Sequence, residues 1–197
     1  MSLVMKAAPE FTAKAVFADG AIKELSLKDF SGKYVCLFFY PFDFTFVCPT
    51  EILAYNHRVT QFQELNCQLL GVSIDSHHVH RAWRGTKIED GGIGEVAFPL
   101  VADVNKTIAN DYGVLLPGGM ALRGLFLIDP KGNVVHETIN NLDIGRNADE
   151  TLRVLEAAHF AAEHGEVCPA GWTKGQSGMK ANPAGVASYL AKNASKL

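Results

Sequence analysis

Three runs of apolar residues have the length and the boundaries of buried strands. They cover residues 35–40, 68–74 and 124–128, and each is flanked by Gly, Pro, Asp or Ser. Short apolar runs between turn residues are typical of central strands. Over residues 50–65, apolar side chains recur at spacings of three and four, which predicts a helix with one apolar face. The pattern therefore predicts that a helix follows the first strand.

A hairpin is predicted in the second half of the chain. The turn residues of 129–133 separate two apolar-patterned segments, 125–128 and 134–139. Because Asp, Pro, Gly and Asn in one short segment favour a tight turn, the flanking strands are expected to be antiparallel. The sheet is therefore expected to be mixed. Two shorter helices are predicted around 79–84 and 106–112.

A longer helix is predicted to begin after Asn147. Asn147 and Glu150 have the spacing of a capping box, with Asn in place of Ser or Thr, and an apolar period follows. Gly165 is expected to end this helix. Beyond it, Gly and Pro are frequent and large apolar residues are few. We therefore expect one domain over 1–165 and a C-terminal arm over 166–197.

The composition is that of one globular domain. The chain has 197 residues, of which 48% are hydrophobic and 20% charged, enough for one substantial core. The net charge of −3 gives no basic surface for nucleic acid. The longest apolar stretch, residues 34–42, is about half as long as a membrane-spanning helix. Since the first residues lack a secretory signal pattern, we expect a cytoplasmic protein with no membrane partner.

The four cysteines stand at positions 36, 48, 67 and 168. No Cys-x-x-Cys pair occurs and the Cys and His spacings match no zinc pattern, so reduced thiols and no metal site are expected. The run His77-His78-Val79-His80 has no complementary ligands around it in sequence and fits the polar start of a helix. No Gly-rich nucleotide loop occurs, so no cofactor is expected.

Cys48 ends an apolar segment and opens a predicted helix. Backbone N–H groups at a helix start are unpaired and carry partial positive charge. They can lower the pKa of a cysteine from about 8.5 to roughly 3.5–7.5, which favours the nucleophilic thiolate. Pro49 suits a first helical position, and Thr45 stands three residues earlier. These local features leave open both a reactive thiol and a buried structural one; Cys36 and Cys67 fit the structural interpretation.

The segment around Cys48 resembles the active-site signature of peroxiredoxins. Its spacing is Pro41-x-x-x-Thr45-x-x-Cys48, within Phe39-Tyr40-Pro41-Phe42-Asp43-Phe44-Thr45-Phe46-Val47-Cys48-Pro49-Thr50-Glu51. Further motifs similar to the typical two-cysteine branch follow in order: Val72-Ser73-Ile74-Asp75-Ser76, His80-Arg81-Ala82-Trp83, Leu122-Arg123-Gly124-Leu125-Phe126-Leu127-Ile128-Asp129, Gly145-Arg146, and Val167-Cys168-Pro169-Ala170-Gly171-Trp172. The resemblance covers nearly the whole chain.

The resemblance implies a thioredoxin-like α/β fold, with a central mixed sheet flanked by helices and an extended C-terminal arm. It implies a thiol-dependent peroxidase that reduces hydrogen peroxide and organic hydroperoxides. Cys48 would be the peroxidatic cysteine, which becomes a sulfenic acid. Cys168 would be the resolving cysteine, which forms an intersubunit disulfide with it. An internal pair such as Cys48 with Cys67 is the alternative.

Five further residues receive roles from the resemblance. The Thr45 hydroxyl is expected to hydrogen-bond the thiolate and the peroxide, and Arg123 to stabilise the negative charge that develops. Pro41 is expected to screen the pocket from water. Glu51 and Arg146 are expected to steady the active-site arginine.

The family also implies an assembly and an electron donor. We expect a homodimer joined through an edge strand, for which residues 134–139 are the candidate, and a decamer of five dimers. Phe42, Phe44, Phe46 and Trp83 are expected near the contact between dimers. Electrons are expected from thioredoxin or a dedicated flavoprotein reductase. A disulfide exchanger is disfavoured by the absent Cys-x-x-Cys, and a holdase chaperone ring is the alternative function.

Two features bear on inactivation by peroxide. Gly91-Gly92-Ile93-Gly94 is similar to the glycine-rich motif of members that are sensitive to overoxidation, but their C-terminal Tyr-Phe pair appears here as Tyr189-Leu190. We expect intermediate sensitivity, because the lost aromatic loosens the cover that the arm provides.

Overall fold

The computed structural model describes residues 2–196, which form two compact units. The units are Met1–Ala148 and Asp149–Leu197, so the division falls in the first turn of a long helix. The boundary expected at residue 165 rests on composition and stays a prediction. No helix of residues 2–196 is both long enough and apolar enough to cross a bilayer.

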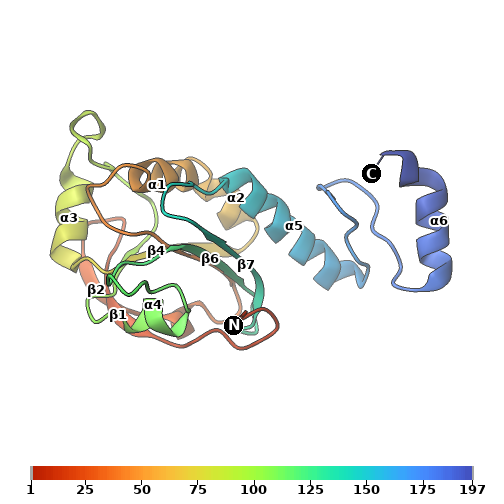
Figure 1. The fold of residues 1–197 in the computed structure, drawn as a ribbon, viewed down its shortest axis with the longest axis horizontal. Coiled ribbons are helices and arrows are strands. Elements are labelled where there is room, and N and C mark those ends of the chain that lie inside the picture. Colours follow the sequence, from red (N-terminus) through yellow and green to blue (C-terminus); the bar gives the residue numbers. More distant parts are fainter. Residues whose placement is uncertain (1, 197) are drawn as a thin grey trace. The chain divides into compact units, whose positions relative to one another are not determined.

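The first unit contains one seven-stranded sheet in the order β2-β1-β5-β4-β3-β6-β7 (Figure 1). The strands are β1 (Thr12–Val16), β2 (Ile22–Ser26), β3 (Tyr34–Phe39), β4 (Cys67–Ser73), β5 (Leu100–Ala102), β6 (Arg123–Ile128) and β7 (Val134–Asn140). β3, β4 and β5 pair in parallel, and every other pairing is antiparallel. The predicted mixed sheet is confirmed, and β7 lies at one of its edges.

The described chain contains six α-helices and three short 3₁₀ helices. They are α1 (Cys48–Asn56), α2 (Val59–Glu64), α3 (His77–Gly85), α4 (Thr107–Asp111), α5 (Ala148–His164) and α6 (Pro183–Asn193), with 3₁₀ turns at Leu27–Phe30, Ile88–Asp90 and Ala194–Lys196. Figure 1 shows α1 and α2 on one side of the sheet and α4 on the other.

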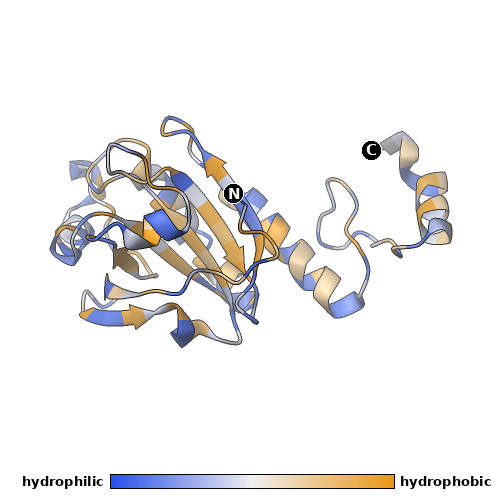
Figure 2. Cartoon of the chain, turned by 60° about the horizontal axis from the view of Figure 1, so that its bottom comes forward, coloured by the Kyte–Doolittle hydropathy of each residue, from blue (hydrophilic) through white to orange (hydrophobic). Residues whose placement is uncertain are grey.

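β3 is apolar throughout because both of its faces are covered. The Phe38 ring stacks on Tyr55 of α1, with ring centroids 4.7 Å apart. The next residue, Phe39, points to the opposite face and contacts Tyr112 at the end of α4, at 5.4 Å. All six β3 residues are buried, and the central strands form the apolar band of Figure 2. The sequence pattern therefore placed the central strands correctly.

The helix predicted over 50–65 is in fact two helices. Arg58, between α1 and α2, has φ −111° and ψ 6°, outside the helical range. Its guanidinium Nη1 donates to the Ala54 carbonyl at 3.0 Å, an oxygen that the break leaves available. The β-branched residues Val59 and Thr60 follow and have low helix propensity. The prediction of one continuous helix was wrong, although its apolar side chains Ile52, Tyr55 and Phe62 are buried.

The predicted hairpin, long helix and two short helices are confirmed as β6–β7, α5, α3 and α4. Four elements had not been predicted: β1, β2, β5 and α6. β1 and β2 are five residues each with mostly polar or half-buried positions, and β5 has only three residues. Such short strands carry little periodic signal.

Candidate active site

Cys48 is the first residue of α1 and its side chain is buried, with 0% exposure. β3 ends at Phe39, and the segment 40–47 carries the chain from the strand to the helix. Pro49 fits the second helical position, where its missing N–H costs nothing. The predicted location of Cys48, between a buried strand and a helix start, is confirmed.

The Cys48 sulfur accepts two hydrogen bonds. The Thr45 hydroxyl donates to Sγ at 3.0 Å and lies 2.8 Å from the Phe42 carbonyl. Arg123, the first residue of β6, places Nη1 3.4 Å from Sγ. A hydroxyl and a guanidinium aimed at one sulfur stabilise negative charge on it. The structure thus brings together three of the residues expected from sequence.

Glu51 lies one turn after Cys48 and joins two buried arginines. Its Oε2 accepts from Arg123 Nη1 at 2.7 Å. Its Oε1 accepts from the Nε and the backbone N of Arg146 at 2.7 and 2.8 Å, and Arg146 Nη2 reaches Oε2 at 2.9 Å. Arg123 Nε and Arg146 Nη1 donate to the carbonyls of Leu142 and Gly124. The guanidinium that faces the sulfur is therefore fixed in orientation.

The buried charged side chains beside Cys48 do not balance among themselves. Two guanidiniums and the Glu51 carboxylate give a net charge of +1 in a site where all three side chains are almost fully buried. A thiolate at Cys48 brings the net charge to zero. Because an uncompensated charge is costly away from water, the arrangement stabilises the anionic sulfur.

The segment 40–47 is held by a buried polar network that had not been predicted. Asp43 accepts from the Tyr40 hydroxyl at 2.9 Å, and its Oδ2 lies 2.7 Å from His80 Nδ1. His80 Nε2 faces the Val101 carbonyl at 3.2 Å, and the Asp43 N–H donates to Asp75 at 2.9 Å. Burial raises the pKa of Asp43, and the hydrogen bond from His80 opposes that rise. Asp43 therefore anchors the segment to α3 and to the end of β4.

Phe44, within this segment, has φ 54°, a left-handed conformation that is strained for a residue with a side chain. Phe44 is 49% exposed, and the centroid of its ring lies 5.8 Å from that of Trp83. Phe46 is 92% exposed. Pro41 is buried and is the second residue after β3. Phe46 is among the most exposed large apolar side chains of the first unit, together with Met5.

Cys168 belongs to the second unit, where its Sγ donates to the Ala157 carbonyl at 3.5 Å. Burial raises the pKa of the Cys168 thiol, and the guanidinium of Arg153 opposes that rise. The site residues expected from sequence thus fall into two groups. Six lie in the first unit, where Thr45 and Arg123 bond the Cys48 sulfur and Glu51 and Arg146 hold Arg123, and Cys168 lies in the second.

A model of the AhpC/TSA family matches residues 4–137, and a model of the C-terminal domain of 1-Cys peroxiredoxin matches residues 157–192. The chain belongs to the peroxiredoxin family. It is a thiol-dependent peroxidase with a thioredoxin-like fold, as the resemblance implied.

Relatives of this peroxiredoxin align over nearly its whole length. Alkyl hydroperoxide reductase C of Helicobacter pylori (strain J99) is 54% identical over 197 residues, 99% of this chain and 100% of that protein. Peroxiredoxin-2 of Bos taurus is 53% identical over 191 residues, 96% of each chain. The crystal structure of the reduced 2-Cys peroxiredoxin of Plasmodium vivax superposes with a TM-score of 0.95 at 47% identity, covering 97% of this chain and 100% of that one.

The remaining thiols of the peroxiredoxin are buried in the sheet. Burial raises the pKa of Cys36 well above its usual range and that of Cys67 to about 12. Both therefore resist ionisation, which agrees with structural roles. Across residues 2–196, no three ligating side chains gather as a metal site would require. Within the run His77-His78-Val79-His80, His80 pairs with the Asp43 carboxylate.

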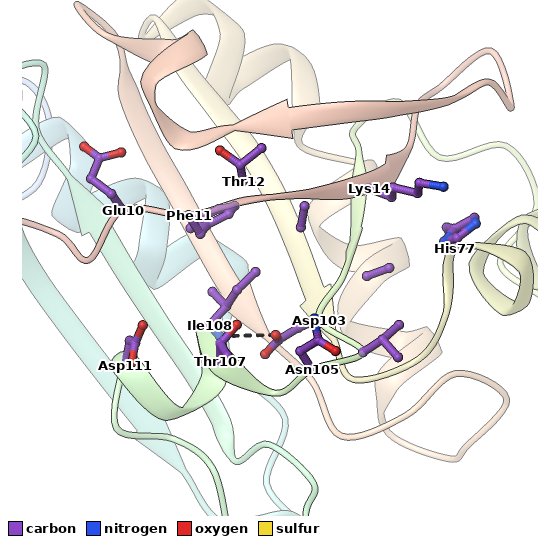
Figure 3. A pocket seen from close by; sticks show the side chains of 13 residues that line it. Glu10, Phe11, Thr12, Lys14, His77, Asp103, Asn105, Thr107, Ile108 and Asp111 are labelled. Carbon is purple, nitrogen blue, oxygen red and sulfur yellow. Dashed lines mark hydrogen bonds between the residues drawn. The ribbon is translucent and has the colours of Figure 1, made fainter.

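A hollow of about 350 Å³ lies apart from the Cys48 cluster, between the start of β1, the start of α3 and α4 (Figure 3). Asp103 in its wall accepts from the backbone N–H groups of Ile108 and Ala109, at 3.1 and 2.8 Å. The carboxylate thus caps α4. None of the expected site residues lines this hollow.

Proposed function

We propose that Cys48 is the residue that reduces the peroxide. Its thiolate attacks one oxygen of the O–O bond, so that an S–O bond forms and the O–O bond breaks. The product is a Cys48 sulfenic acid, and the leaving alkoxide or hydroxide takes a proton to become an alcohol or water. The observation that carries the proposal is a buried sulfur that accepts from both Thr45 and Arg123.

The surrounding residues stabilise the transition state, in which negative charge moves from sulfur to the departing oxygen. The Thr45 hydroxyl and the Arg123 guanidinium first donate to the sulfur and then to the oxygens of the bound peroxide. Glu51 and Arg146 fix the direction of Arg123. Pro41 keeps water away from the anionic sulfur. These donors are in position before the peroxide arrives, so little reorganisation is needed.

The second step is disulfide formation with Cys168 of a neighbouring subunit. The Cys168 thiolate attacks the sulfenic sulfur, an S–S bond forms, and the S–O bond breaks to release hydroxide, which becomes water. Because Cys48 is fully buried and a disulfide needs Cα atoms within roughly 7 Å, segment 40–47 and the first turn of α1 must open. This step requires a homodimer, for which edge strand β7 is the candidate interface, and a decamer of five dimers is the expected ring.

The disulfide is then reduced by a partner protein with a dithiol. A relative from Pongo abelii, 50% identical over 190 residues, is named thioredoxin-dependent peroxide reductase. A thioredoxin or a dedicated flavoprotein reductase is accordingly the expected donor, with the reaction in the cytoplasm. The comparisons do not favour the alternative of a holdase chaperone.

A single-turnover experiment tests the proposal. The reduced protein receives one equivalent of hydrogen peroxide, and the products are separated on a non-reducing gel. The parent should give a disulfide-linked dimer, Cys48→Ser should consume no peroxide, and Cys168→Ser should stop at a sulfenic acid that dimedone traps. Cys36→Ser is the matched control and should behave as the parent. Peroxide consumption by Cys48→Ser, or a monomer with an internal disulfide that still forms in Cys168→Ser, would overturn the proposal.

A further inference from the structure

The segment that carries Cys168 is folded into a compact loop by its own contacts. Val167 and Met179 pair through two backbone hydrogen bonds of 2.9 Å, which close the loop at its base. Inside it, the Trp172 N–H donates to the Pro169 carbonyl and the indole Nε1 donates to the Gln176 carbonyl, both at 3.1 Å. The resolving cysteine therefore sits in an ordered turn.

Trp172 attaches this loop to helix α5. Its side chain is only 3% exposed and its ring lies against Phe160, with centroids 4.9 Å apart. The Trp172 carbonyl accepts a 2.7 Å hydrogen bond from Nη1 of Arg153. Glu150, one turn earlier on α5, holds the same guanidinium through two bonds of 2.7 and 2.8 Å. We call Glu150, Arg153 and the Trp172 carbonyl the Arg153 clasp.

The clasped loop keeps the Cys168 sulfur in its less reactive form. The thiol donates its hydrogen to the Ala157 carbonyl, which lies one turn after Arg153 on α5. A thiol whose hydrogen is engaged in this way is a poor nucleophile, since the thiolate is the attacking species. The sulfur must leave the carbonyl before it can attack another atom.

We propose that Arg153 is a positioning residue for the resolving step, and that release of the Arg153 clasp precedes disulfide formation. The inference rests on the proposed role of Cys168. In the resting enzyme the clasp holds the loop on α5 with its thiol protonated. When the clasp opens, the thiol loses its carbonyl acceptor, ionises in water and attacks the sulfenic acid.

The sign of the effect separates this proposal from a simpler one. If Cys168 reacted while still clasped, the positive charge of Arg153 would favour its thiolate, and removing the charge would slow disulfide formation. If the loop must first be released, Arg153 acts only on the closed state, and removing it shifts the loop toward the open state. Disulfide formation then becomes faster.

The test measures the two chemical steps separately in single turnovers with one equivalent of hydrogen peroxide. Quenched samples report the Cys48 sulfenic acid as its dimedone adduct and the disulfide by intact mass. In Arg153→Gln we expect disulfide formation to be roughly three- to tenfold faster, as the loss of one or two hydrogen bonds implies, with sulfenic acid formation unchanged. Alkylation of Cys168 by iodoacetamide in the reduced protein should accelerate by a similar factor.

Two further variants keep the outcome decisive. Glu150→Gln retains Arg153 but weakens its orientation, and should shift both rates in the same direction by less. Lys174→Gln is the matched control, because Lys174 also links the loop to α5, through an exposed contact of 3.7 Å to Glu156, without touching Trp172. It should behave as the parent.

Unchanged or slower disulfide formation and alkylation in both clasp variants would overturn the inference. The alkylation readout needs no peroxide chemistry. If the parent forms no Cys168-dependent disulfide, the proposed function is wrong. The alkylation rate of Cys168 in the parent and in the variants then still shows whether Arg153 holds the loop closed.

Discussion

The sulfurs of Cys48 and Cys168 have opposite hydrogen-bonding roles. Cys48 Sγ accepts from a hydroxyl and a guanidinium, whereas Cys168 Sγ donates to a carbonyl. The first arrangement favours a thiolate and the second a neutral thiol. This difference agrees with the roles proposed for the two cysteines, attack on the peroxide by Cys48 and later attack on the sulfenic acid by Cys168.

The two regions also differ in the sequence separation of the residues whose hydrogen bonds hold them in place. Glu51 and Arg146, which fix the Cys48 cluster, are 95 positions apart, whereas Arg153 and Trp172 are 19 apart. The Cys48 cluster ties together three distant segments and is part of the first unit's core. The Cys168 loop is held by local contacts on the surface of one helix. Substitutions that break the Cys48 cluster should therefore lower stability, whereas those in the Cys168 loop should leave stability nearly unchanged.

The largest difference is expected between the losses of unfolding free energy that Glu51→Gln and Glu150→Gln cause. Loss of the Glu51 charge leaves two buried guanidiniums without their shared partner, so the free energy of unfolding should fall by about 3–5 kcal/mol. Glu150 is a half-exposed partner in an i,i+3 pair, and its loss should cost less than about 1 kcal/mol. Urea denaturation of the reduced proteins measures both. Equal losses would refute the contrast.

Arg123→Met should reduce the second-order rate of the reaction with hydrogen peroxide by about 10²–10³, because one preorganised donor to the developing charge is lost. Stopped-flow measurement under pseudo-first-order conditions gives this rate. The same substitution at the exposed Arg81 is the control and should leave it within about twofold. A loss below tenfold in Arg123→Met would mean that the guanidinium does not act on the reacting atoms.

Thr45→Val should reduce the same rate by roughly 10–100-fold, since the isosteric side chain removes only the hydroxyl donor to Cys48 Sγ. Thr45→Ser keeps a hydroxyl and should recover most of the rate. If the Val and Ser variants reacted equally fast, the hydrogen bond at 3.0 Å would have no catalytic role.

The last prediction concerns Cys67, a buried thiol outside both regions, and its effect appears only at alkaline pH. Its pKa of about 12 in the folded protein lies above the usual 9.0, so the folded state keeps the proton longer. The resulting stability is present below pH 9 and is lost as the pH rises from about 9 to 12, with a slope approaching about −1.4 kcal/mol per pH unit. The unfolding free energy of Cys67→Val should lack this component. Identical alkaline slopes in the two proteins would contradict the assignment.

The elements that sequence analysis identified are those with a strong local signal. β3, β4 and β6 are short apolar runs because both faces of the sheet are covered, and the start of α1 is indicated by Cys48 and Pro49. The motifs around Cys48 supplied its neighbours Thr45, Glu51 and Arg123, whose distances agree with their expected roles. Their roles remain the subject of the experiments above.

The features that were missed depend on side-chain contacts that hydrophobic patterning does not report, one distant in sequence and one local. His80 was interpreted as part of a polar helix start, but it is fully buried because α3 packs it against Asp43, 37 positions earlier. His80 begins a motif similar to the family's, but nothing in that motif indicates its contact with Asp43. The break between α1 and α2 depends on Arg58, whose side chain bonds a carbonyl that a continuous helix would have used. Tertiary context decided the first case, and local side-chain bonding and low helix propensity decided the second.

The left-handed backbone at Phe44 has an energetic consequence for the catalytic cycle. A residue with a side chain at φ 54° stores about 1–2 kcal/mol relative to an ordinary conformation. That energy is returned when segment 40–47 leaves its folded position, so it offsets part of the cost of separating Tyr40 and Asp43 from His80 and Phe44 from Trp83. If the proposed disulfide forms, this single backbone torsion lowers the free-energy cost of the opening that precedes it.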